Sequence, residues 1–125
     1  FVLMGKVSYL ESISIQKQAD FLLLLNWMND ENKNSKGVIP GKFYEYLGAN
    51  KPIILWNEGQ DNELKSLCMN INKKSHEGKV IIIDDKNTLY PNIVDFNFSS
   101  DMVVVLEYSR ECQFNKLLKE LMKNE

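Results

Sequence analysis

The chain has few of the residues that build specialised scaffolds. Its 125 residues include two cysteines, three prolines, six glycines and one histidine. Two cysteines are too few for a disulfide framework or a tetrahedral zinc site. The low glycine and proline content excludes collagen-like and low-complexity chains. We therefore expect one domain that is held together by an apolar core, in a reducing, cytoplasmic environment.

Long apolar runs and an excess of positive charge are also missing. The run at residues 21–25 is as long as any in the chain, far below the ~20 residues of a membrane-spanning helix. Fifteen basic and 17 acidic residues give a formal net charge of −2, so we expect no nucleic-acid partner. The chain begins at Phe1 without a leader pattern, as if inside a strand. We expect an N-terminally truncated piece of a longer protein.

Short apolar runs alternate with segments of helical pattern along the whole chain. The runs predict strands at residues 1–4, 20–25, 52–56 and 79–83. Helices are predicted at residues 8–18, 40–47, 61 or 62 to about 73, and 111–123. Continuous apolar strands that alternate with helices are typical of parallel sheets buried on both faces. The expected fold is a single α/β domain over residues 1–125, with helices on both faces of a parallel sheet.

Several local signals refine this prediction. Ser8 and Glu11 can form a capping box at the start of the first helix, whose apolar positions include Leu10 and Ile15. Gly48 is expected to end the helix at residues 40–47. Turns or a single helical turn are expected at residues 86–100. Residues 101–108 suit either a strand or a helix.

The helix that follows Pro40 has no capping side chain. Val38 and Ile39 precede it, so the amides of Gly41, Lys42 and Phe43 are expected to lack partners. Free amides at the positive end of a helix form an anion site, and Gly41 allows a ligand to approach closely. The long polar loop at residues 26–37 leads into this helix.

A carboxylate follows one turn behind this predicted anion site. Glu45 lies three residues after Lys42, on the same side of the helix. This spacing suits a phosphate held near Lys42 and a ribose diol hydrogen-bonded to Glu45. The alternative is that Lys42 and Glu45 form an exposed ion pair, which contributes about 0.2–0.5 kcal/mol to stability, and that water solvates the start of the helix.

The order of these segments resembles a known enzyme family. The matching segments are residues 5–7, 19–25, 37–49 and 51–54. They look like the carboxy-terminal, nucleotide-sugar-binding domain of GT-B glycosyltransferases of the glycosyltransferase group 1 kind, a Rossmann-like half of the enzyme. The likeness covers roughly residues 1–85 and extends weakly to residues 108–111 and the last helix. Its most diagnostic stretch is residues 40–49, followed by Lys51 and Pro52.

The resemblance implies roles for individual residues of the predicted helix. The family's glutamate that holds the donor ribose falls on Glu45. The amides of Gly41, Lys42 and Phe43 would face the donor diphosphate, and Lys42 would stabilise the leaving group. No metal and no cofactor is implied besides the donor, a UDP- or GDP-linked sugar.

The loop before this helix departs from the family pattern. By the resemblance, Gly37, Val38 and Ile39 would border the donor sugar. Many members have a second glutamate eight residues before the ribose-binding one, and this chain has Gly37 there. A carboxylate that contacts the sugar from this loop is therefore not expected.

The resemblance also implies a partner domain. The parent enzyme would move a sugar from a nucleoside diphosphate sugar to an acceptor hydroxyl, in a cleft between this domain and an amino-terminal acceptor domain. The isolated chain is therefore expected to be inactive. Contact of the parent protein with a membrane surface is left open.

Other chemistry-bearing residues have simpler interpretations. His76 is expected in a surface turn, and Cys68 in the core, while Cys112 lies near a helix start without a nearby base. Asp84 and Asp85 are expected to cap a turn rather than hold a divalent ion. Two tryptophans that follow predicted strands are expected to pack rather than stack on a ligand, Trp27 and Trp56.

Two other functions stay open. One is a non-catalytic α/β binding or interaction module such as a receiver domain, although the second predicted strand ends in Leu25-Asn26 and carries no phosphoacceptor aspartate. The other is a different nucleotide-binding enzyme, for which the chain offers neither Gly-x-Gly-x-x-Gly nor a Walker-type loop.

Overall fold

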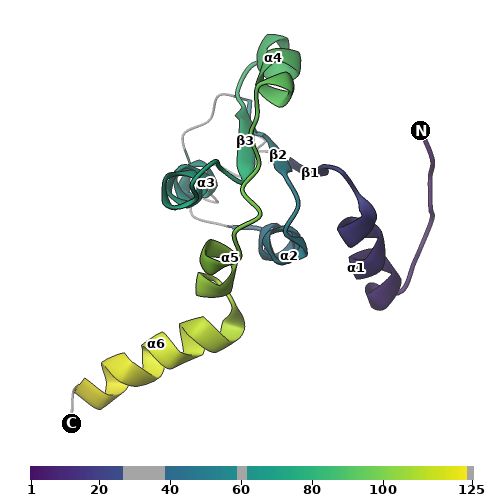
Figure 1. Cartoon of the computed structure of the whole chain (residues 1–125). Helices are drawn as coiled ribbons and strands as arrows, with labels where there is room; N and C mark the ends of the chain where they lie inside the picture. The colour runs from purple at the N-terminus through teal and green to yellow at the C-terminus, as the bar shows by residue number, and fades with distance from the viewer. Residues whose placement is uncertain (27–38, 59–61, 124–125) are drawn as a thin grey trace, which may run out of the picture.

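A computed structural model describes residues 1–26, 39–58 and 62–123 (Figure 1). Three strands alternate with helices in this part of the chain. The strands are β1 (Leu22–Leu25), β2 (Ile53–Trp56) and β3 (Val80–Ile83). The helices are α1 (Tyr9–Gln18), α2 (Gly41–Ala49), α3 (Glu63–Lys74), α4 (Leu89–Val94), α5 (Val103–Glu107) and α6 (Arg110–Lys123), and a 3-10 turn, η2 (Lys86–Thr88), precedes α4.

The strands form one parallel sheet in the order β1-β2-β3, so the predicted α/β class is confirmed. Leu22 pairs with Ile53, and Ile53 pairs with Val80. Because all three strands run in one direction, their carboxyl ends share one edge of the sheet. Ligands of open α/β sheets bind at this edge.

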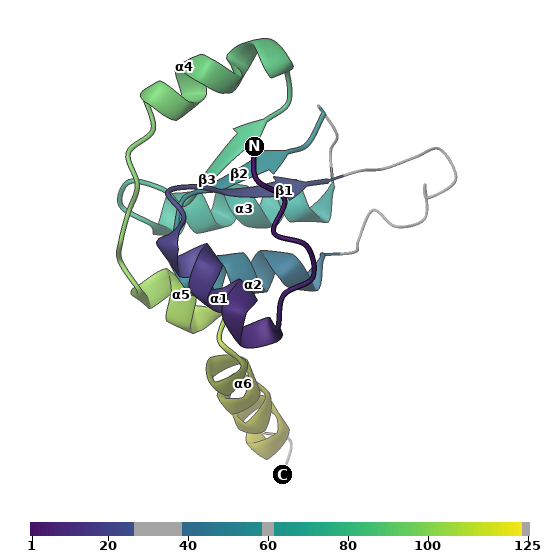
Figure 2. The same cartoon turned by 90° about the vertical axis from the view of Figure 1, so that its right-hand side faces the viewer.

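One face of the sheet carries the apolar core. Leu24, Ile53, Leu55 and Val80 are buried there. Figure 2 shows α2, α3 and α5 below the sheet, on this face. Their contributions to the core are Phe43 and Leu47 from α2, Leu64, Cys68 and Ile71 from α3, and Val104 and Val105 from α5. Burial of each large side chain stabilises the fold by about 1.5–3 kcal/mol.

The other face of the sheet is covered less completely than predicted. Helix α4 contacts β3, where Ile81 and Ile83 are buried. Leu23 and Leu25 of β1 are 52% and 62% exposed on this face. The expectation that residues 20–25 are buried on both faces is therefore wrong for β1. It is an edge strand, and no helix of the described residues covers its second face.

Residues 1–4 do not form the predicted buried strand. Phe1, Val2, Leu3 and Met4 are all exposed, in an extended segment that lies apart from the sheet (Figure 1). An apolar run becomes a strand only when a neighbouring strand accepts its hydrogen bonds. In the described chain β1 pairs with β2 alone, so no strand plays this part for residues 1–4.

Helix α1 begins as predicted but buries a different side. Ser8 accepts a hydrogen bond from the Glu11 amide, and the Glu11 carboxylate accepts one from the Ser8 amide, which confirms the capping box. Leu10 and Ile15, expected on the apolar side, are exposed, and α1 buries Gln16 instead. Five residues are about 140° apart around a helix, so these two side chains cannot share one narrow stripe.

Helix α2 extends past the predicted cap at Gly48. Its C-cap is Asn50, in the left-handed conformation with φ 54°. Asn tolerates this conformation, and here its side chain has two partners: Nδ2 donates to Ser100 O over 3.1 Å, and Oδ1 accepts from Lys79 Nζ over 2.9 Å. Gly48 is therefore an interior residue of the helix.

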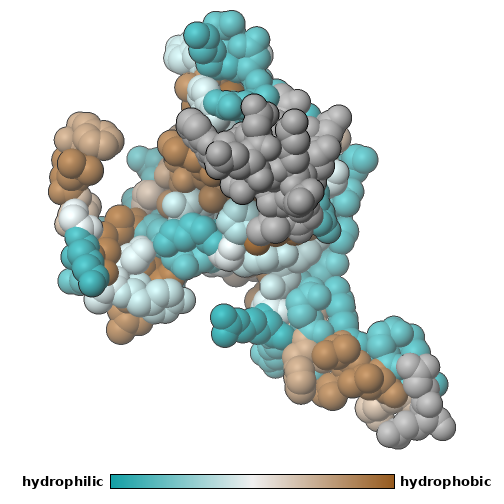
Figure 3. Space-filling view, turned by 180° about the vertical axis from the view of Figure 1, so that it is seen from behind, coloured by the Kyte–Doolittle hydropathy of each residue, from teal (hydrophilic) through white to brown (hydrophobic). Residues whose placement is uncertain are grey.

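The carboxy-terminal third is helical. The helical turn expected at residues 86–100 corresponds to η2 and α4, and the ambiguous segment at residues 101–108 contains α5. Asp101 Oδ1 accepts a hydrogen bond from the Val103 amide at the start of α5, over 2.9 Å. The predicted last helix, α6, buries none of its residues and extends away from the sheet (Figure 1). Figure 3 shows its apolar side chains on the surface.

Candidate functional site

The amino-terminal end of α2 follows the loop after β1 and thus lies on the carboxyl side of the sheet. Pro40 is the N-cap and provides no side-chain hydrogen bond, as predicted. The Phe43 amide donates to Pro40 O over 3.0 Å, which corrects the expectation that this amide is free. Over the described ranges no acceptor is found for the amides of Gly41 and Lys42. The anion site that the sequence predicts at this helix start would therefore comprise two free amides rather than three.

Lys42 and Glu45 meet on α2 as their spacing predicts. Lys42 Nζ lies 2.9 Å from Glu45 Oε1, and the same oxygen accepts a hydrogen bond from Gln16 Nε2 over 2.5 Å. Lys42 Nζ also lies 5.8 Å from the ring centre of Tyr46. Glu45 is therefore held from two sides, by its own helix and by α1.

These bonds change the proton affinities of both charged groups. The hydrogen bond from Gln16, followed by the one from Lys42, lowers the pKa of Glu45 below its ordinary value. The hydrogen bond to Glu45 raises the pKa of Lys42 above its ordinary value. The pair is thus a carboxylate and an ammonium at neutral pH, and the carboxylate can accept hydrogen bonds from hydroxyl groups.

A cleft beside the start of α2 adds a second positive charge. Its lining residues are Gly41, Tyr44, Tyr108, Arg110 and Gln113. The sequence indicated residues 108–111 only as a weak extension of the resemblance. The structure brings Arg110, the first residue of α6, to the same cleft as Gly41. A guanidinium here, together with the positive end of α2, suits an anionic group.

The other predicted site residues have mixed positions. Phe43 is fully buried and fixes α2 to the core, and Ile39 is partly buried against the same core. Only the backbone of Phe43 could therefore face a ligand, and its amide is already bonded. Gly37 and Val38 lie outside the described residues, as does Trp27.

A polar network at the carboxyl ends of the strands was not predicted. Asn26, Asn57 and Asp84 directly follow β1, β2 and β3. Asn57 is fully buried. Its Oδ1 accepts from Asn26 Nδ2 and from Asn62 Nδ2, each over 3.0 Å, and its Nδ2 donates to Asp84 Oδ1 over 3.0 Å. The available signal was that each strand is followed by an Asn or Asp.

Of the two aspartates expected to cap a turn, Asp85 does so, whereas the expectation is wrong for Asp84, which pairs with Lys65 and with the amide of Asn57. Asp84 Oδ2 accepts a hydrogen bond from Lys65 Nζ over 2.8 Å, and Asp85 caps η2 through the Asn87 amide. In residues 1–26, 39–58 and 62–123 no group of three or more His, Cys, Asp or Glu side chains is placed to hold a metal ion. Trp56 Nε1 donates to Glu58 Oε1 over 3.3 Å, at the rim of a cleft that also contains Asp84.

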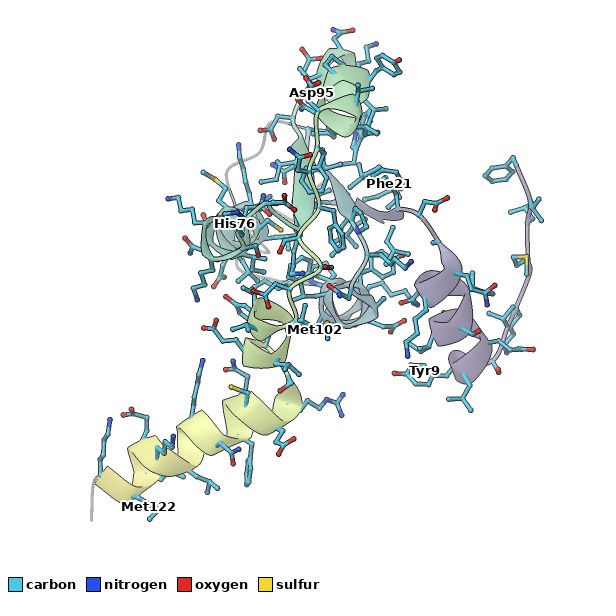
Figure 4. The ribbon with its side chains drawn as sticks, viewed as in Figure 1. Tyr9, Phe21, His76, Asp95, Met102 and Met122 are labelled. Carbon is cyan, nitrogen blue, oxygen red and sulfur yellow. The ribbon has the colours of Figure 1, made fainter. Side chains whose placement is uncertain are left out.

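The remaining candidates lie elsewhere. His76 is exposed in the turn after α3 (Figure 4). Cys68 is buried as predicted, and burial raises the pKa of its thiol to about 12. Cys112 is partly exposed on α6. The helices in the described part of the chain include none with the length and apolar character of a membrane span.

Comparison with known proteins adds no relative. A scan against protein-family models finds no match to this sequence, and searches of curated proteins and of solved structures find no significant match.

Proposed function

We propose that this chain is the donor-side domain of a GT-B glycosyltransferase of the group 1 kind and binds a nucleoside diphosphate sugar. The observation that carries the proposal is the position of Glu45. It lies one turn inside an uncapped helix start, ion-paired with Lys42 at 2.9 Å, on the carboxyl side of a parallel sheet. Phosphate at the helix start and a carboxylate one turn later match the two polar parts of a nucleoside diphosphate.

Each group has a role in the proposed complex. The Gly41 and Lys42 amides and the Lys42 ammonium neutralise the diphosphate, and Arg110 adds charge from the other side of its cleft. Glu45 accepts hydrogen bonds from the ribose hydroxyls. Fixed positive groups at the diphosphate stabilise the leaving group as the bond to the sugar breaks.

Sugar transfer needs more than this site. The proposed reaction takes place in a cleft between two domains, and the acceptor and any catalytic base come from the amino-terminal domain. The isolated chain is therefore expected to bind the donor weakly and not to transfer sugar.

An alternative function is a non-catalytic interaction module. The exposed apolar side of α6 favours it: Phe114, Leu117, Leu118, Leu121 and Met122 are all exposed. This alternative gives no reason for the Lys42–Glu45 pair at an uncapped helix, and we rank it second.

NMR titration of the chain with UDP, GDP and their sugar conjugates tests the proposal. Shifts at the amides of residues 39–46 and near Arg110, abolished by Glu45→Gln, are expected. Glu120→Gln is the matched control, because it removes another exposed i,i+3 pair, with Lys123 at 3.1 Å, far from the site. If no nucleotide shifts these amides at millimolar concentration, the donor-binding proposal is wrong and the interaction module becomes the better explanation.

A further inference from the structure

Gln16 is the residue that α1 buries against the rest of the chain. Its exposed fraction is 6%, whereas the apolar residues Leu10 and Ile15 of the same helix are exposed. Helix α1 packs beside α2. A glutamine at this contact is unusual, because apolar side chains normally fill helix–helix interfaces.

The Gln16 side chain is oriented by its partners. Its Nε2 donates to Glu45 Oε1 over 2.5 Å and to Ser12 Oγ over 3.1 Å. A carboxylate accepts hydrogen bonds and cannot donate them, so the nitrogen of the amide must face Glu45. The amide oxygen is then directed away from Glu45.

That oxygen has no hydrogen-bond partner among the described residues, although it is buried. A buried, unsatisfied acceptor costs about 1–3 kcal/mol. Leucine or methionine would fill the same space without this penalty. Stability therefore does not explain a glutamine at this position. Buried polar atoms normally have hydrogen-bond partners, and exceptions are expected mainly at functional sites.

What Gln16 does achieve is to fix Glu45. Both side chains that donate hydrogen bonds to Glu45, those of Gln16 and Lys42, bind the same oxygen, Oε1. Within residues 1–26, 39–58 and 62–123 no partner is found for Oε2. The carboxylate is thus held by one oxygen from two helices, and its second oxygen is left to accept a hydrogen bond from elsewhere.

We propose that Gln16 is a positioning residue of the nucleotide site, which holds the Glu45 carboxylate in the rotamer that accepts the ribose hydroxyls of a nucleoside diphosphate. This inference rests on the proposed function. It adds a residue of α1 to the site, 29 positions before Glu45. Gln16 itself does not touch the nucleotide, because its amide is buried between the helices.

The test compares Gln16→Met with Gln18→Met in the full chain. Gln18 is a matched control, since its Nε2 donates to Ser14 Oγ over 3.1 Å, one turn back, as Gln16 does to Ser12, but it is exposed. Three quantities are measured: the Glu45 pKa by carboxyl NMR, the UDP and GDP affinities by titration, and the melting temperature. Gln16→Glu, of similar size, is a second variant that replaces the donor with a carboxylate.

The expected result separates positioning from stability. Gln16→Met raises the Glu45 pKa and weakens nucleotide binding about 5–10-fold, the equivalent of one lost hydrogen bond, with an unchanged or higher melting temperature. Gln16→Glu raises the Glu45 pKa further, because like charges then face each other. Gln18→Met changes none of the three quantities.

Three outcomes would contradict these statements: two concern the role of Gln16, and the third concerns the proposed function. If the unmodified chain binds UDP or GDP and Gln16→Met binds equally well, Gln16 does not position the site and the inference is wrong. If Gln16→Met leaves the Glu45 pKa unchanged, the inference is wrong as well. If the unmodified chain binds neither nucleotide, the proposed function fails, and the ribose role assigned through Gln16 fails with it.

Discussion

The side-chain amide of Asn57 donates a hydrogen bond to Asp84 Oδ1 over 3.0 Å. Asn57 directly follows β2 and Asp84 directly follows β3, so this bond joins neighbouring strands beyond their last paired residues, Trp56 and Ile83. Asn26, which directly follows β1, donates a hydrogen bond to Asn57 and so connects the third strand to this network. The carboxyl edge of the sheet is therefore tied together by side chains.

Substitution of Asn57 by alanine is expected to destabilise the fold. The substitution removes a fully buried side-chain amide, and Asn26, Asn62 and Asp84 each lose the hydrogen bond that they make with it. The free energy of unfolding is therefore expected to fall by about 2–3 kcal/mol. Urea denaturation measures the change. Asn87→Ala, at an exposed position, is the control, and an equal effect of both variants would show that the Asn57 network is not stabilising.

Lys79 is expected to stabilise the fold through the hydrogen bonds that its side-chain nitrogen donates. This buried residue donates to Asn50 Oδ1 over 2.9 Å and to the backbone oxygen of Ser99 over 2.7 Å. Lys79→Met keeps most of the apolar stem and leaves the buried Ser99 oxygen unpaired, which lowers the free energy of unfolding by about 1–3 kcal/mol. Urea denaturation measures this change in the free energy of unfolding, and Lys73→Met, at an exposed position, is the control. Equal losses of stability in the two variants would contradict the prediction.

The same lysine gives a pH dependence. Burial lowers the pKa of Lys79 below its ordinary value of 10.5. Between the folded-state pKa and 10.5 the unfolded chain binds more protons, so this group makes stability rise with pH in that window. Lys42 acts in the opposite direction, because its pKa is raised. Stability curves of the unmodified chain minus those of Lys79→Met should therefore increase with pH below 10.5, and a flat difference would contradict the assignment.

The two cysteines should differ sharply in reactivity. Burial raises the pKa of Cys68 to about 12, and thiolate is the reactive form. Cys112 is partly exposed on α6. In the native chain a thiol reagent should modify Cys112 rapidly and Cys68 only after unfolding, and peptide mass spectrometry identifies the labelled residue. Rapid native labelling of Cys68 would mean that α3 does not pack as described.

Leucines of α6 and α3 should respond differently to truncation. Leu117 on α6 is 55% exposed, so Leu117→Ala should change the free energy of unfolding by less than about 0.5 kcal/mol. Leu64→Ala on α3, at a buried core position, should cost about 2–5 kcal/mol. Denaturation of both variants at low concentration is the measurement. A large loss for Leu117 would show that the apolar side of α6 is covered in solution.

Much of the fold follows from local sequence pattern. The short apolar runs at β2 and β3 predicted these strands. Asn62, one of the two residues predicted to begin α3, caps this helix because its Oδ1 accepts a hydrogen bond from the Lys65 amide. The strand predicted at residues 1–4 failed because pairing depends on a neighbouring strand, which composition does not reveal. The exposure of β1 depends on its place at the edge of the sheet, another property of the whole fold.

In the candidate site, too, some contacts follow from local sequence and others depend on the packing of distant segments. The contact of Lys42 with Glu45 follows from helix geometry, because residues three apart are neighbours. Gln16 could not be found from pattern, since a polar residue among exposed ones gives no sign of burial. Arg110 is brought to Gly41 by the packing of the last third of the chain against α2, over a long separation in sequence.

The parallel order of the three strands also has a consequence for how the chain folds. Leu22 pairs with Ile53, and Ile53 pairs with Val80, each across about 30 residues, so no strand pair can form as a local hairpin. During synthesis the leucines of β1 are made before β2, so they have no strand to pair with until β2 has also been synthesised. Folding of the sheet should therefore be slow compared with formation of the helices, and an aggregation-prone interval should fall between the synthesis of β1 and β2.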